Sequence, residues 1–255
     1  MPTTPPMNSG SSVRLGRVRL RVPDRRLVIG TLVLADALLV LLYLLSQRIF
    51  VGRHPALAHM FDLDGEGNAA AWFASSQLLL VAALSLLCAL QVDDRALRHF
   101  YYLLGAAFVF FSADEAAMIH EPLTFFLRAY SVTTPLPGPD HVTWMFPYVA
   151  VMVVLFILMR KGLVPFLRFS TGRLAFLVGA ALFVLGGMVV EVVGYYILVH
   201  FAIDYYGRGG TLQVVLEESC ELLGVTLMAC GLLTRLYGFE PTQAGTSPAP
   251  RSPAA

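Results

Sequence analysis

Six apolar runs, most of them close to 20 residues long, constrain this chain more than any other feature of its sequence. An α-helix needs about 20 apolar residues to cross the roughly 30 Å hydrocarbon core of a bilayer. The composition agrees, because 57% of the residues are hydrophobic and only 14% are charged, against about 25% charged in an ordinary soluble domain. We therefore expect an all-α fold, namely a polytopic membrane bundle of about six transmembrane helices.

The expected spans follow these apolar runs along the chain. They cover Leu27–Leu45, Ala69–Leu90, Phe100–Glu121, Trp144–Met159, Leu174–His200 and Thr211–Thr234. One transmembrane domain (26–237) then lies between a basic N-terminal tail (1–25) and a C-terminal tail (238–255). Residues 1–12 and 241–255 are rich in Pro, Ser and Thr, so both tails are expected to be disordered.

The distribution of Lys and Arg predicts the orientation of the bundle. Fourteen of these residues fall in segments on the side of the two termini, and four fall on the other side: Arg48, Arg53, Arg128 and Arg208. By the positive-inside rule both termini are cytoplasmic, which places the protein in the plasma (inner) membrane among membrane lipids. No basic patch is interleaved with aromatic residues, so a nucleic-acid partner has no support.

Carboxylates gather near the outer ends of three expected spans. At 1.5 Å per residue, Asp114 and Glu191 lie roughly 21 and 26 Å from the cytoplasmic starts of their helices, and Glu217 lies roughly 9 Å from its outer end. The three helices therefore bring acids to a similar depth in the outer leaflet. The full set comprises Asp114, Glu115, His120 and Glu121 in the third span, Glu191 in the fifth, and Glu217, Glu218 and Glu221 in the sixth.

Helical geometry predicts which of these side chains can share a pocket. At 100° per residue, the three glutamates of the sixth span occupy one face. A straight third span does not bring His120 to the side of Asp114, but Pro122 can loosen the helix near Met118 and let His120 turn inward. Small residues let neighbouring helices approach, so the glycines at 187 and 194 indicate that Glu191 faces protein.

Acidic residues at this depth need an explanation, because their spans contain no internal Lys or Arg. An ionised side chain at mid-bilayer costs roughly 2.5 to 3.5 kcal/mol and marks a functional site by default. Such carboxylates must be protonated, hydrated or neutralised by cations. Together with an imidazole they match the ligands of zinc, iron or manganese. We therefore predict a divalent metal held by Asp114, His120, Glu121, Glu191, Glu217 and Glu221.

Two readings of this site stay open. The first is a metal-dependent enzyme that acts on a lipid or another apolar substrate, with Glu115 and Glu218 as spare carboxylates for acid–base catalysis. The alternative is a proton- or cation-coupled transporter, because intramembrane acids also mark ion pathways. A bis-histidine haem held by His120 and His200 is a further possibility. The buried acid Asp36 lies deeper and is not assigned to the site.

The first outer loop carries a second acidic stretch, at residues 62–68. Its D-x-D-x-E-G pattern matches the opening of a calcium-binding loop, but position twelve is Phe73 in place of the bidentate glutamate. A polar turn is therefore favoured over a calcium site. The same loop is also placed to cover the acidic cluster as a lid.

Three motifs carry a family resemblance. They are the Ser-Ala-Asp-Glu and Ile-His-Glu segments at 112–121, the FDLDGEGN loop followed by Trp72, and Glu-Glu-x-x-Glu-Leu-Leu-Gly from Glu217. Together they resemble a group of uncharacterised bacterial multi-pass membrane proteins over about residues 25–237. The resemblance implies the topology and a shared site, and no particular reaction. The architecture is also similar to that of alkaline ceramidase-like membrane hydrolases, although their paired late histidines are missing here.

Overall fold

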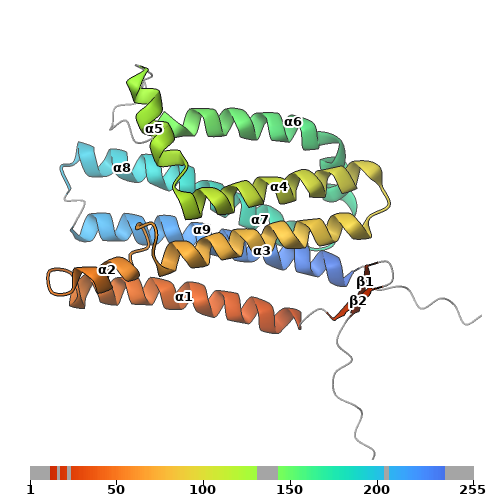
Figure 1. The fold of residues 1–255 in the computed structure, drawn as a ribbon, viewed down its shortest axis with the longest axis horizontal. Helices are drawn as coiled ribbons and strands as arrows, with labels where there is room; N and C mark the ends of the chain where they lie inside the picture. Colours follow the sequence, from red (N-terminus) through yellow and green to blue (C-terminus); the bar gives the residue numbers. More distant parts are fainter. Residues whose placement is uncertain (1–11, 16–17, 22–23, 131–142, 204–206, 239–255) are drawn as a thin grey trace, which may run out of the picture.

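The computed structural model describes residues 12–15, 18–21, 24–130, 143–203 and 207–238. Within these residues, six helices are long and apolar enough to cross a membrane, and they lie alongside one another in one bundle (Figure 1). The prediction of an all-helical bundle with six spans is confirmed. The predicted tails fall largely outside the described residues.

The six spans and the shorter elements follow one another along the chain. The spans are α1 (Arg25–Ile49), α3 (Ala69–Gln91), α4 (Arg95–Ala117), α6 (Met145–Phe169), the composite α7 (Arg173–Val184), η2 (Leu185–Val190) and α8 (Glu191–His200), and α9 (Arg208–Tyr237). The shorter elements are α2 (Pro55–Met60), α5 (His120–Ala129) and an antiparallel pair of strands, β1 (Ser12–Leu15) and β2 (Val18–Arg21).

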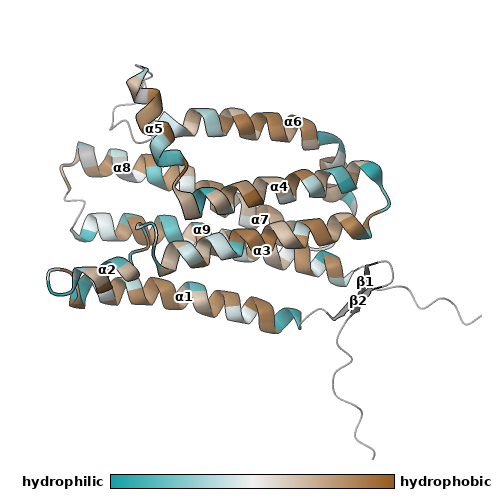
Figure 2. Cartoon of the chain, in the orientation of Figure 1, coloured by the Kyte–Doolittle hydropathy of each residue, from teal (hydrophilic) through white to brown (hydrophobic). Residues whose placement is uncertain are grey.

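The two ends of the bundle differ in character. One end holds the loop of residues 61–68 and α5, and we call it the acidic end. At the opposite end, called the terminal end, α1 begins and α9 finishes (Figure 1). Apolar residues dominate the middle of the helices and polar residues concentrate toward their ends (Figure 2). Outward-facing leucines such as Leu34, which is 69% exposed, form the surface that lipid would cover.

Capping side chains set the start of several helices. The side chain of Asp94 accepts a hydrogen bond from the backbone N–H of Leu97, so α4 begins at Arg95, before the predicted start at Phe100. The Asn68 side chain accepts from the N–H groups of Ala70 and Ala71 and starts α3. Such caps satisfy N–H groups that have no partner within the helix.

Helices α7 and α9 pack closely along a seam of small residues. Three close approaches recur at seven-residue intervals along both helices; they pair Gly172 with Gly231, Gly179 with Gly224, and Gly186 with the backbone of Glu217. A Cβ atom added at Gly179 would overlap the Gly224 carbonyl oxygen and lie 2.7 Å from the Met228 nitrogen. Small residues at such positions let membrane helices approach until their backbones touch.

Helix α6 contacts the bundle tightly at the terminal end. A Cβ atom at Gly162 would overlap the carbonyl oxygen of Ala96 in α4. Nearby, the buried Phe166 stacks on Phe100 at 5.0 Å between ring centroids and meets Phe176 of α7 edge-on at 5.4 Å. These contacts close the space between α6 and α7 at the terminal end. The helix extends ten residues past its predicted end at Met159, because Arg160, Lys161 and Arg168 can extend their charged groups to the membrane surface.

A buried polar cluster ties α1 to the bundle. Asp36 accepts hydrogen bonds from the Gln77 amide at 2.6 Å and the Thr226 hydroxyl at 2.8 Å. These partners belong to α3 and α9, so the cluster joins three spans. Hydrogen bonds between membrane helices contribute about 0.6 kcal/mol each on average, and up to about 1.7.

Asp36→Leu should therefore lower the free energy of unfolding by about 1 to 3 kcal/mol, because it removes both hydrogen bonds and leaves Gln77 and Thr226 with only their mutual hydrogen bond at 3.1 Å. Unfolding by sodium dodecyl sulfate in mixed micelles measures the change. Asp36→Asn is the matched control, since its amide oxygen still accepts one of the two hydrogen bonds. Equal stability of Asp36→Leu and the unmodified protein would contradict this account.

Candidate functional site

The site begins where α4 ends, four residues before the predicted end at Glu121. The helix finishes at Ala117, and Met118 adopts the left-handed conformation with φ 55° and ψ 40°. The Met118 N–H donates a hydrogen bond to the Asp114 carbonyl oxygen at 2.7 Å, which completes the last turn of the helix. Helix α5 then starts at His120, and Pro122 lies in its first turn, where a missing N–H removes no helical hydrogen bond.

This break turns His120 back toward Asp114. The His120 backbone N–H donates to the Asp114 carboxylate at 2.9 Å, and its Nδ1 atom lies 3.3 Å from the same oxygen. On the other side of the ring, Nε2 lies 3.5 Å from a carboxylate oxygen of Glu66. The imidazole thus lies between two carboxylates.

The protonation of this trio responds to its surroundings. Burial lowers the pKa of His120, but the hydrogen bond to Asp114 and the nearby carboxylates outweigh that effect and raise the pKa above its ordinary value. Burial also raises the pKa of Glu66 to about 6, against the opposing effect of His120. The second carboxylate oxygen of Glu66 is buried and has no hydrogen-bond partner among the described residues.

The loop of residues 61–68 holds Glu66 in place through Asn68. While its oxygen caps α3, the Asn68 amide group donates to the carbonyl oxygens of Asp62 at 2.7 Å and Gly65 at 2.6 Å. This folds the loop over the acidic end, and both Asp64 and Glu66 line the cavity beneath it. The loop therefore lies where a lid would.

The facing wall is built by η2 and α9. At the acidic end of the seam, the backbone of Gly186 lies against Glu217, and a Cβ atom at Gly187 would lie 2.8 Å from a carboxylate oxygen of Glu221. The missing side chain at Gly187 leaves the space that this carboxylate occupies. A π-helical turn such as η2 is rare and frequently lies at a functional site.

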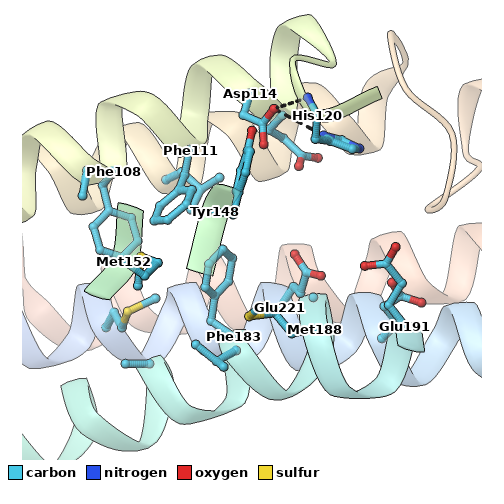
Figure 3. Close-up of a pocket in the computed structure, with 18 of the residues that line it drawn as sticks. Phe108, Phe111, Asp114, His120, Tyr148, Met152, Phe183, Met188, Glu191 and Glu221 are labelled. Atoms are coloured by element: carbon cyan, nitrogen blue, oxygen red, sulfur yellow. Dashed lines mark hydrogen bonds and ion pairs between the residues drawn. The ribbon is translucent and has the colours of Figure 1, made fainter. Parts of the chain in front are cut away.

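All these groups surround one cavity of about 390 Å³ between α4, α6, α7, η2 and α9. In Figure 3, Asp114 and His120 lie on one wall and Glu191 and Glu221 on the opposite wall. Eight carboxylates and one histidine line it, and none of its described lining residues is Lys or Arg. They are Asp64, Glu66, Asp114, Glu115, His120, Glu191, Glu217, Glu218 and Glu221.

The cavity contains seven of the eight residues that the sequence predicted for the site. The exception is Glu121, which is exposed in the first turn of α5 and does not line the cavity. His200 also lies elsewhere, exposed and stacked on Tyr196 at 5.6 Å, so the structure does not pair it with His120 for a haem. Asp64 and Glu66 are additional lining residues that the sequence did not assign to the site.

The carboxylates line the cavity without converging on one point. Within the described part of the chain, no three His, Cys, Asp or Glu side chains lie close enough to hold one metal ion as they stand. Asp114 and Glu66 do approach the imidazole of His120, at 3.3 and 3.5 Å. Glutamate side chains have three rotatable bonds, so rotation of Glu115, Glu217 or Glu221 can bring further oxygens toward a cation.

Beyond the acids, the cavity continues as an apolar arm, which we define by Phe108, Phe111, Met152, Phe156, Phe183 and Met228. Tyr148 lies between the two parts, with its hydroxyl group directed toward Asp114 (Figure 3). Trp144 links this tyrosine to the His120 ring at centroid distances of 4.9 and 5.2 Å. One cavity thus combines an acidic end with an apolar extension.

Six helices that are long and apolar enough to cross a membrane fit a multi-pass integral membrane protein. The chain belongs to a family described as a domain of unknown function (DUF8692), whose model matches residues 31–236. This agrees with the resemblance to an uncharacterised family, and the description names no activity. No curated protein and no solved structure matches the chain.

Proposed function

We propose that this protein is a divalent-metal-dependent membrane enzyme that acts on a lipid-like substrate. One observation carries the proposal: a single cavity joins eight carboxylates and a histidine to an apolar arm. The acidic part suits a cation, and the apolar part suits the hydrocarbon portion of a substrate. A site that held only ions would need no apolar extension.

Charge supports a metal ion in the acidic part. Carboxylates that face one another without a basic partner repel, and a divalent cation removes this repulsion. Oxygen ligands with an imidazole suit zinc, iron and manganese. Asp114, His120, Glu191, Glu217 and Glu221 remain the proposed ligands, and we leave out Glu121 because it lies outside the cavity.

The spare carboxylates supply the acid–base chemistry. A bound divalent metal lowers the pKa of a coordinated water and turns it into a nucleophile near neutral pH. Glu115 and Glu218 line the same cavity, so either would serve as the general base for an attacking water and as the general acid for the leaving group. This division of roles fits hydrolysis of a polar bond next to a hydrocarbon chain.

The distribution of Lys and Arg supports a location of this chemistry outside the cytoplasm. Fourteen Lys and Arg residues fall in sequence segments on the side of the two termini and four fall on the other side, which favours cytoplasmic termini. We therefore propose that the cavity lies in the outer leaflet of the plasma (inner) membrane.

Metal analysis of the protein, purified without chelator in lipid nanodiscs, tests the proposal. We expect at least one zinc, iron or manganese ion per chain, and a melting temperature that falls when EDTA removes it. Metal should bind more weakly at pH 5.5 than at pH 7.5, because its ligands must lose protons. Protein without stoichiometric metal, whose melting temperature neither EDTA nor added Zn²⁺ and Mn²⁺ changes, would contradict the proposal.

A second candidate is a proton- or cation-coupled transporter. The observation that favours it is the cluster of Asp36, Gln77 and Thr226, which offers a deeper polar position on α9, eight residues beyond Glu218. Cation or proton flux into proteoliposomes that disappears in Glu217→Gln would favour this candidate over the enzyme.

A further inference from the structure

We propose that the apolar arm receives the single hydrocarbon chain of a membrane amphiphile, which enters sideways from the bilayer between α6 and α7. Its uncharged or cationic head then lies among the carboxylates. This inference rests on the proposed function, because it names the substrate class of the same cavity. Four observations carry it: the contact of α6 with α7 at the terminal end, the exposure of residues that line the cavity on both helices, the cavity volume and the charge of its acidic part.

Helix α6 contacts α7 near the terminal end. Around Gly162 and Phe166 it touches α4 and α7. Toward the acidic end, Met152 and Phe156 of α6 and Phe183 and Val184 of α7 all line the cavity. The space between the two helices is therefore closed at the terminal end and belongs to the cavity toward the acidic end.

The residues that border the opening between α6 and α7, which we call the lips, are exposed on the surface that faces the membrane. Met152, Phe156 and Val184 line the cavity and are nevertheless 41%, 61% and 42% exposed. At 1.5 Å per residue, Met152 and Phe156 lie about 10 and 16 Å from the start of α6. This depth falls within the roughly 30 Å hydrocarbon core of a bilayer, so the lips face acyl chains.

The volume of the cavity favours an amphiphile with one hydrocarbon chain over one with two. At about 30 Å³ for a water-sized group, a cavity of about 390 Å³ accommodates on the order of a dozen heavy atoms. That number matches a small head group together with one hydrocarbon chain of moderate length. It is too small for the two acyl chains of a phospholipid.

The charge of the acidic part selects the head group. Eight carboxylates and no described Lys or Arg line the cavity. One divalent ion balances only two negative charges, so an anionic head would still meet repulsion from the remaining carboxylates. A hydroxyl, amide or amine group donates hydrogen bonds to carboxylates. The aromatic rings of Trp144 and Tyr148 beside His120 also suit a cationic head, because ring faces attract cations.

Photolabelling in nanodiscs tests the inference. The probe is dodecylamine with a diazirine near the end of its chain, and mass spectrometry locates the labelled residues. We expect labels on the cavity side of α6 and α7. Ala180→Phe, which fills the apolar arm, should reduce this labelling at least about tenfold, equivalent to about 1.4 kcal/mol of binding.

The chain offers matched controls for the filling substitution. Ala181 is the next residue of α7, is exposed and does not line the cavity, so Ala181→Phe should leave labelling unchanged. If Ala180→Phe does not fold, Ala107→Phe on the α4 wall replaces it, with the exposed Ala106→Phe as its control. Equal labelling of a filled variant and the unmodified protein overturns the inference.

Two further probes test the chain number and the head group. Equal cavity labelling by a phospholipid that carries the diazirine on one of two chains overturns the single-chain assignment. Stronger labelling by dodecyl phosphate than by dodecylamine overturns the assignment of the head group. Metal content is measured in the same samples. If the protein contains metal but its cavity is not labelled, only this inference is rejected. If the cavity is labelled, and Ala180→Phe reduces that labelling, but the protein contains no metal, only the proposed metal chemistry is rejected.

Discussion

Replacing Glu217 and Glu221 together with glutamine should weaken divalent metal binding by more than about 100-fold. Even groups that only hydrogen-bond to metal ligands change affinity by about 10- to 100-fold when they are replaced, and these two carboxylates are proposed as direct ligands. Glutamine keeps the size of each side chain and removes its charge. The packing of α9 against η2 should therefore be retained.

Thermal unfolding with and without metal measures this effect. At a free metal concentration of 100 times the dissociation constant, the unmodified protein gains about 2.7 kcal/mol, and a variant with 100-fold weaker binding gains about 0.4 kcal/mol. Without metal the variant should be more stable than the unmodified protein, because two repelling charges are gone. A smaller stabilisation by metal combined with a higher stability without metal distinguishes the loss of a metal ligand from simple damage to the fold.

Glu121→Gln is the matched control for that experiment. Glu121 carries the same charge and lies near the same end of the bundle, but it is exposed and outside the cavity. Its replacement should leave metal affinity and the metal-dependent stabilisation unchanged. Loss of metal in Glu121→Gln, or full metal binding in the double variant, would show that the cavity is not the metal site.

The bilayer explains why the sequence predicted the six helices. Each span must satisfy its backbone hydrogen bonds internally and cover about 30 Å of hydrocarbon, so apolar length alone identifies it. The same reasoning placed Asp114, Glu191 and Glu217 at one level, and the structure brings all three to one cavity. Depth along a helix follows from residue count, which is why this part of the site was predictable.

Local backbone conformation explains what the sequence did not predict. The end of α4 depends on a left-handed Met118, and no glycine marks that position. A helix continued through it, as predicted, carries Glu121 toward the other acids, whereas the structure leaves Glu121 exposed and outside the cavity. Glu66 was missed because its position depends on the hydrogen bonds of Asn68 within the loop. An asparagine just before the apolar run of α3 is a capping signal that would have tied this loop to the acidic end.

Gly179→Ala should lower the free energy of unfolding by about 3 kcal/mol or more. Overpacking of a core typically costs about 1 to 3 kcal/mol, and here the added atom meets the backbone of Gly224 and Met228, which cannot rotate away as a flexible side chain would. Helices α7 and α9 must then separate along the seam. Unfolding in mixed micelles by sodium dodecyl sulfate measures the loss.

Gly30→Ala provides a control of opposite expected sign. An added Cβ atom at Gly30 in α1 has no neighbour within 4 Å, and alanine is favoured over glycine inside a helix by up to about 1 kcal/mol. Gly30→Ala should therefore be neutral or stabilising. Equal effects of the two substitutions would mean that the seam contributes no more than an ordinary helix surface.

The seam also connects stability to the proposed metal site. Its seven-residue spacing continues from Gly179 to Gly186, whose backbone lies against Glu217, and the next residue, Gly187, lies against the Glu221 carboxylate. Separation of α7 from α9 therefore moves the two walls that carry the acidic residues. Gly179→Ala protein that still folds should bind metal more weakly, although Gly179 itself does not line the cavity. Unchanged metal affinity in that folded variant would show that the walls are positioned independently of the seam.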